Sequence, residues 1–92
     1  MLDLLDPIDD LFRALADPTR RQIVERLDDG PVSVSTLARP FPITLAAVAR
    51  HVQILESAGV ISTSKVGRER ICQLDFDRID TVRGWLDDRR RR

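Results

Sequence analysis

Residues 33–58 read SVSTLARPFPITLAAVARHVQILESA, and this stretch decides the fold. Ser33 can cap a short helix, and Pro40 ends it because the residue before a proline avoids the helical region. Thr44 can then cap a second, longer helix, for which Gly59 offers a left-handed stop. Two helices joined by a turn, with the longer one second, predict a helix-turn-helix.

The second helix, expected at about 45–58, has two unlike sides when it advances by 100° per residue. One side collects four apolar side chains that we expect to face the core, Leu45, Val48, Val52 and Leu55. The opposite side carries two small and two polar residues, Ala46, Ala47, Arg50 and Gln53. Small residues let the helix approach base edges, Arg50 can donate two hydrogen bonds to guanine, and Gln53 can pair with adenine. The pattern favours a helix that reads the major groove, with a phosphate at its N-terminus.

A basic hairpin is expected directly after this helix. Residues 61–66 and 69–74 are short strand candidates joined across Gly67. Three cations surround the turn, Lys65, Arg68 and Arg70, and Glu69 is the one acidic residue among them. An exposed basic hairpin beside a reading helix predicts a wing that clamps phosphate or enters the minor groove.

Further helices are expected at about 8–16, 18–28 and 76–89, from apolar residues at helical spacing. The first and last of them carry more apolar side chains than a core of 92 residues can hide. We therefore expect these two helices to pack against a second copy in a C2 homodimer, with the reading helices about 34 Å apart. The residues assigned to this dimer surface are Leu4, Leu5, Ile8, Leu11, Phe12, Ile79, Val82, Trp85 and Leu86.

The expected fold class is mainly α with a small β-hairpin, a winged helix-turn-helix of five helices plus a two-stranded wing. All 92 residues are expected to form one domain. Its parts are the helix-turn-helix at about 33–58, the wing at about 61–74, and dimerisation helices at about 4–16 and 76–89.

The distribution of charge along the chain favours nucleic-acid binding, although the net charge does not. The formal net charge is zero at pH 7. Residues 1–30 hold eight acidic and four basic side chains, whereas residues 31–72 hold two acidic and five basic ones. The middle of the chain is thus a basic island, and a local field attracts phosphate even when the total charge is zero.

Several motifs, in order, resemble the ArsR/SmtB family of bacterial repressors. They are LADPTRR at 15–21, LA at 37–38, ITLAAVARHV at 43–52, LESAGVI at 55–61 and GRER at 67–70. The resemblance runs from about residue 11 to residue 75. It implies a dimeric winged helix-turn-helix repressor that binds an imperfect inverted repeat in double-stranded DNA. It also implies that the DNA-facing residues include Thr44, Ala46, Ala47, Arg50, His51 and Gln53.

Two departures from the family pattern reduce the polar contacts of the reading helix. Ala49 stands where the family often has serine, and Ala46 stands where it often has proline. Base readout is therefore expected to depend on Arg50 and Gln53, together with DNA shape.

The sequence indicates a branch of the family that lacks the metal-binding cysteines. Metal-sensing members carry a Cys-x-Cys pair at the start of the third helix, where this chain has Ser33 and Ser35. Serine hydroxyls are poor ligands for soft or borderline metals. The last helix has carboxylates but no histidine. We expect no metal and no cofactor. The inducing signal stays open between a small molecule, a partner protein and protein abundance.

Cys72 is the single cysteine, and it is either a redox switch or a structural residue of the strand. A redox switch would require an intermolecular disulfide and a thiol whose pKa Arg70 lowers. The favoured interpretation is a small, half-buried strand residue.

Other functions have less support in the sequence. No Ser-His-Asp or Cys-His constellation and no glycine-rich phosphate loop is present, so an enzyme is not expected. The alternative is a winged-helix protein-interaction module without DNA binding, which the basic island disfavours because interfaces deplete lysine. No run of about 18 apolar residues occurs, so no membrane span is expected. A lone cysteine and an acidic N-terminus without signal-peptide features favour the cytoplasm.

Overall fold

Five α-helices and a three-stranded antiparallel sheet make up the computed structural model over residues 6–91, the part of the chain that it describes. In chain order the elements are α1 (Pro7–Leu15), α2 (Pro18–Arg26), the 3-10 turn η1 (Leu27–Asp29), β1 (Val32–Ser33), α3 (Val34–Ala38), α4 (Leu45–Ser57), β2 (Ile61–Val66), β3 (Glu69–Leu74) and α5 (Phe76–Arg90). The fold is a winged helix-turn-helix of mainly α class, as the sequence predicts.

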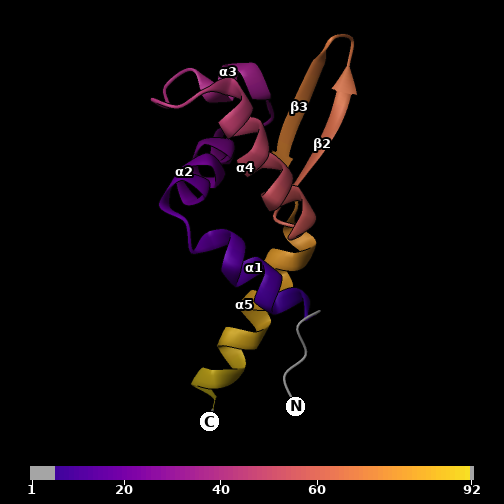
Figure 1. Ribbon diagram of the computed structural model, residues 1–92. Helices are drawn as coiled ribbons and strands as arrows, with labels where there is room; N and C mark the ends of the chain where they lie inside the picture. Colours follow the sequence, from indigo (N-terminus) through magenta and orange to yellow (C-terminus); the bar gives the residue numbers. More distant parts are fainter. Residues whose placement is uncertain (1–5, 92) are drawn as a thin grey trace.

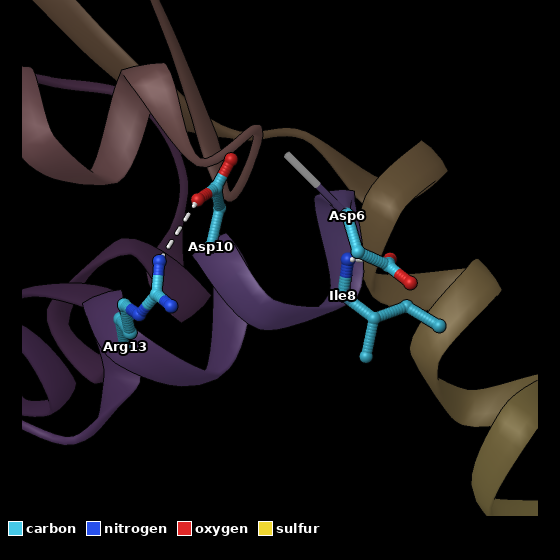
Figure 2. Close-up of polar contacts among 4 residues, drawn as sticks. All are labelled: Asp6, Ile8, Asp10 and Arg13. Atoms are coloured by element: carbon cyan, nitrogen blue, oxygen red, sulfur yellow. Dashed lines mark hydrogen bonds and ion pairs between the residues drawn. The ribbon is translucent and has the colours of Figure 1, made fainter. Parts of the chain in front are cut away.

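Each α-helix begins at a residue whose side-chain oxygen accepts a backbone N–H of the first turn. The predicted caps Ser33 and Thr44 are confirmed by bonds of 3.1 and 3.0 Å, and Asp17 caps α2 with a bond of 3.0 Å. Asp6 and Asp75 do the same for α1 and α5. Figure 2 shows Asp6 at the start of α1 beside Ile8, whose backbone N–H it accepts at 2.9 Å. These bonds satisfy N–H groups that have no partner inside the helix.

The sheet has the strand order β1-β3-β2. The β2–β3 hairpin has the predicted bounds, and Gly67 occupies its turn with a positive φ of 63°. Strand β1 was not predicted from the sequence. Its two residues pair with β3, Val32 opposite Cys72 and Ser33 opposite Ile71, so that the base of the wing has three strands instead of two.

The core lies between the helices and the base of the sheet. Its most buried large side chains come from α2, α3, α4 and the chain entering β2: Ile23, Leu37, Leu55, Ile61, Val48 and Val60. Val48, Val52 and Leu55 of α4 are buried as expected. Leu45 is not, and the expectation of a core position for it was wrong: 55% of it is exposed. It is the first residue of α4 and lines an open groove between α4 and the hairpin, which leaves no neighbour to cover it.

The molecule is elongated, with extents of 47 × 24 × 21 Å. The hairpin tip and α3 lie toward one end, and α1 and α5 lie toward the other (Figure 1). No helix within residues 6–91 is long and apolar enough to cross a membrane.

Candidate nucleic-acid interface

The outward side of α4 carries the predicted reading residues. Arg50 and Gln53 are exposed, as are Thr44 and Ala46, while Ala47 and His51 are half-buried. Among the described residues, neither Arg50 nor Gln53 has a hydrogen-bonded or ionic partner. The first turn of α4 contains no acidic residue, so the positive end of the helix is not neutralised from within. This side can therefore accept a phosphate at its start and present two polar side chains along its length.

His51 lies on the inner flank of α4 and contacts Arg20. Nη1 of Arg20 lies 3.4 Å from Nδ1 of His51. Nε of the same arginine donates to the carbonyl oxygen of Ala14 at 2.6 Å. The contact joins α4 to the junction of α1 and α2. No pattern in the sequence indicated this pairing, because the two residues are 31 positions apart.

The wing presents its cations in two ways. Lys65 and Arg68 are exposed and have no partner among residues 6–91. Arg70 is engaged: its Nη1 donates to Oγ1 of Thr63 at 3.0 Å. The hydroxyl and backbone N–H of Thr63 in turn donate to Oε2 of Glu56 at 2.7 and 3.2 Å.

We call this series of hydrogen bonds, from Arg70 through Thr63 to Glu56, the wing brace. It ties both strands of the hairpin to the last turn of α4. The brace was not predicted from the sequence, because it joins three exposed or half-buried polar residues whose types are ordinary for a surface.

Two grooves flank α4. The first, of about 610 Å³, separates α4 from the hairpin and is lined by Val34, Ser35, Leu45, Ala49, Val52, Gln53, Glu56, Arg68, Glu69 and Arg70. The second, of about 590 Å³, separates α4 from α1 and α2, and Arg13, Arg20 and Arg50 contribute to its lining. Arg13 also forms an ion pair with Asp10 one turn earlier in α1, with 3.7 Å between Nη1 of Arg13 and Oδ1 of Asp10 (Figure 2). The ridge of α4 thus stands between two hollows that both contain arginine.

The start of α3 holds hydroxyl groups that bond to one another. Oγ of Ser33 donates to Oγ1 of Thr36 at 2.9 Å, accepts the N–H of Thr36, and lies 3.2 Å from Oγ of Ser35. No three His, Cys, Asp or Glu side chains within residues 6–91 gather closely enough to hold a metal ion.

Cys72 is fully buried, rather than half-buried as expected. Burial raises the pKa of its thiol, and this outweighs the opposing effect of Arg70. The thiol therefore stays protonated and shielded.

The residues assigned to the dimer surface divide into three groups. Leu4 and Leu5 lie outside the described residues. Leu11 and Val82 belong to the core of the chain itself, and Ile8 and Ile79 are half-buried against it. Phe12, Trp85 and Leu86 are exposed by 43%, 40% and 48%.

Two of these exposed side chains form one aromatic surface across α1 and α5. The rings of Phe12 and Trp85 meet edge to face, with centroids 6.3 Å apart. The guanidinium of Arg89 lies over the Trp85 ring at 4.6 Å. We call Phe12, Trp85 and Leu86 together the aromatic patch.

Comparison with known proteins gives a consistent result. A family model for a helix-turn-helix domain matches residues 15–63. The HTH-type transcriptional regulator Rv2034 of Mycobacterium tuberculosis is 42% identical over 79 residues, covering 86% of this chain and 74% of that protein. The transcriptional repressor SdpR of Bacillus subtilis is 34% identical over 79 residues, covering 86% and 88%. The crystal structure of the ArsR family transcriptional regulator RHA00566 has a TM-score of 0.89 at 40% identity and covers 94% of both chains.

These similarities include the helix-turn-helix and, in the solved structure, the wing and the flanking helices as well. They place the chain among regulators and not among enzymes. This chain belongs to the ArsR family of DNA-binding, winged helix-turn-helix transcriptional regulators.

Proposed function

We propose that this regulator is a homodimeric repressor that binds an inverted-repeat operator in double-stranded DNA and needs no metal. The observation that carries the proposal is the outward side of α4. There Arg50 and Gln53 stand exposed and without partners among residues 6–91, on a capped helix, beside the cationic hairpin. In this proposal the 92 residues act as one domain, with about 33–58 and 61–74 on the DNA.

Base readout depends on α4. Arg50 donates to guanine and Gln53 pairs with adenine in the major groove. Thr44, Ala46, Ala47 and His51 lie on or beside the same surface, and the small side chains allow close approach. The start of α4 binds a phosphate, because its N–H groups and dipole favour an anion there.

The wing holds the DNA backbone. Lys65 and Arg68 contact phosphates, since their charges are not engaged elsewhere among the described residues. Arg70 uses Nη1 for the wing brace, which leaves its remaining guanidinium donors for a phosphate. The brace keeps the hairpin at a fixed position relative to α4, so that both elements can reach the same duplex.

The aromatic patch supports the homodimer. Exposed Phe, Trp and Leu side chains gather where α1 and α5 meet, away from the reading helix. The homodimeric winged helix-turn-helix DNA-binding domain of Mb0332 from Mycobacterium bovis has the same fold, with a TM-score of 0.76 at 23% identity. A C2 pair joined through this patch would present its two reading helices to successive turns of the DNA, about 34 Å apart.

The hydroxyl cluster at Ser33, Ser35 and Thr36 supports the absence of metal sensing. These hydroxyls bond to one another and offer no thiolate or imidazole. We expect that chelators, and added zinc, nickel, cadmium or copper, leave operator affinity unchanged. A metal that binds stoichiometrically and releases the DNA would refute this part of the proposal.

The test of DNA reading begins with selection of bound duplexes from a random library, followed by titration of the selected operator. Arg50→Ala should weaken binding by about 5- to 150-fold for each half-site, and by the square of that factor for a dimer on both half-sites, and should relax the preference at one base pair of each half-site. Arg83→Ala, an exposed arginine on α5, is the matched control and should bind as the parent does. Equal affinity of the parent and Arg50→Ala would show that the reading side is wrongly assigned.

The wing is tested by salt dependence. The slope of log affinity against log salt is negative, and its steepness should decrease by about 0.9 for every phosphate that a variant no longer neutralises. A dimer loses one such contact in each protomer, so Lys65→Ala and Arg68→Ala should each make the slope less steep by about 1.8. The base preference should stay unchanged. An unaltered slope in both variants would remove the wing from the DNA interface.

A further inference from the structure

The exposed side of α4 is apolar over the first five residues of the helix, 45–49. Leu45 is 55% exposed, Ala46 is exposed and Ala49 is half-buried. The polar reading residues, Arg50 and Gln53, follow later in the helix. The N-terminal part of a recognition helix is the part that meets base edges in known helix-turn-helix complexes. In this chain that part offers hydrocarbon in place of hydrogen-bonding groups.

Leu45 lies on the flank of α4 that faces the wing. It lines the groove of about 610 Å³ together with Ala49 and the cationic Arg68. A DNA strand whose phosphates reach Arg68 would run along this groove. The base edges next to that strand would then face Leu45.

The chemistry of the base edges restricts what a leucine can recognise. Guanine, adenine and cytosine present acceptors and donors in the major groove, whereas thymine adds a C5-methyl group. Leucine has neither donor nor acceptor, so its one favourable partner there is this methyl group. A polar base edge pressed against Leu45 would lose water without gaining a hydrogen bond.

We propose that Leu45 determines specificity by contacting the C5-methyl of a thymine in each operator half-site. This inference rests on the proposed function and deepens it, because it names a base that Arg50 and Gln53 do not read. Ala49 borders the same surface and leaves room for the methyl.

The experiment removes the methyl group alone. Each thymine of the selected operator is replaced in turn by deoxyuridine, which keeps the base pair and lacks the methyl. For the parent protein, one position per half-site should weaken binding about fourfold, or about fifteenfold when both half-sites are changed. In Leu45→Ala the same replacements should have no effect, because the leucine that meets the methyl is already absent.

Ile43→Ala is the matched control. Ile43 is another exposed apolar residue, 40% exposed, in the linker just before α4. Its variant should respond to deoxyuridine as the parent does. Circular dichroism would establish that both variants are folded, which their exposed positions favour.

The outcomes separate this inference from the proposed function. If the parent binds no selected duplex, the proposed function fails. If the parent binds but deoxyuridine has the same effect on the parent and on Leu45→Ala at every position, the inference about Leu45 is wrong and the repressor stands. A selected operator without an invariant thymine in each half-site would overturn the inference in the same way.

Discussion

Replacing Trp85 by alanine should separate the proposed dimer into folded protomers. A tryptophan side chain offers about 250 Å² of surface, of which the 40% exposed in the single chain is about 100 Å². Covering that area with a second copy contributes about 2.5 kcal/mol at 25 cal/mol per Å². Because a C2 interface contains the residue twice, the variant should lose about 5 kcal/mol of association free energy. The dimer dissociation constant should then rise by about three to four powers of ten.

Sedimentation equilibrium over a dilution series measures this constant directly. Phe76→Ala is the matched control, since Phe76 is an exposed aromatic on the same helix, 59% exposed, but lies at its other end, outside the aromatic patch. It should leave the dissociation constant unchanged. The Trp85 variant also loses its edge contact with Phe12, so its protomer should be less stable by about 1 kcal/mol but still folded.

Two results would refute the reasoning. One is a Trp85→Ala protein that dimerises as tightly as the parent. The other is a Phe76→Ala protein that dissociates more than the Trp85 variant, which would move the interface to the sheet end of α5.

Three further predictions concern stability and reactivity. Gly59→Ala should lower the free energy of unfolding by about 1–2 kcal/mol in chemical denaturation, because φ is +79° there and a Cβ would lie 2.5 Å from Cγ of Arg78. Gly84→Ala should raise the free energy of unfolding by about 0.5–1 kcal/mol, because Gly84 lies within α5 and has open space around it. Effects of the same sign in the two variants would contradict this prediction. Cys72 should react with a thiol reagent only on unfolding, because it is buried and burial raises the pKa of its thiol; a rapid reaction of the native protein would contradict the assignment. Asp17→Ala should cost about 1 kcal/mol at neutral pH, and Asp17→Asn much less, because Asp17 caps α2. The backbone N–H of Arg20 holds the pKa of Asp17 below its usual value, so the part of the stability that needs the charged carboxylate should be full above about pH 4 and be lost as pH falls through the lowered pKa. The parent and Asp17→Asn should therefore become alike at low pH, and a difference between them that stays constant would rule out the charge of the carboxylate as its source.

The order of elements could be predicted from the sequence because the signals that set it are local. Asp17, Ser33 and Thr44 cap helices through bonds to residues three positions away, and the β2–β3 hairpin follows from its turn. β1 could not be predicted, since two residues are too few for an alternating pattern. It exists because β3 offers an unpaired edge, and that is a property of the folded chain.

Side-chain placement was harder to predict, because it depends on elements distant in sequence. Helical periodicity put Leu45 with Val48 in the core, but periodicity does not reveal that no neighbour covers the first turn of α4. The wing brace joins Glu56 to Thr63 and Arg70 across three elements, so no spacing indicates it. The surplus of apolar side chains in the first and last helices was visible in the sequence, but its division between core and surface was not.

Ser33 belongs to two elements at once, pairing with Ile71 of β3 and capping α3. The hairpin therefore cannot pivot away from the helix-turn-helix without breaking either a strand pair or a helix cap. In the proposed dimer, each protomer would then meet DNA with its wing and its reading helix held in one fixed arrangement by Ser33. An inducer that releases the operator would then act most readily by altering the distance or tilt between the two protomers.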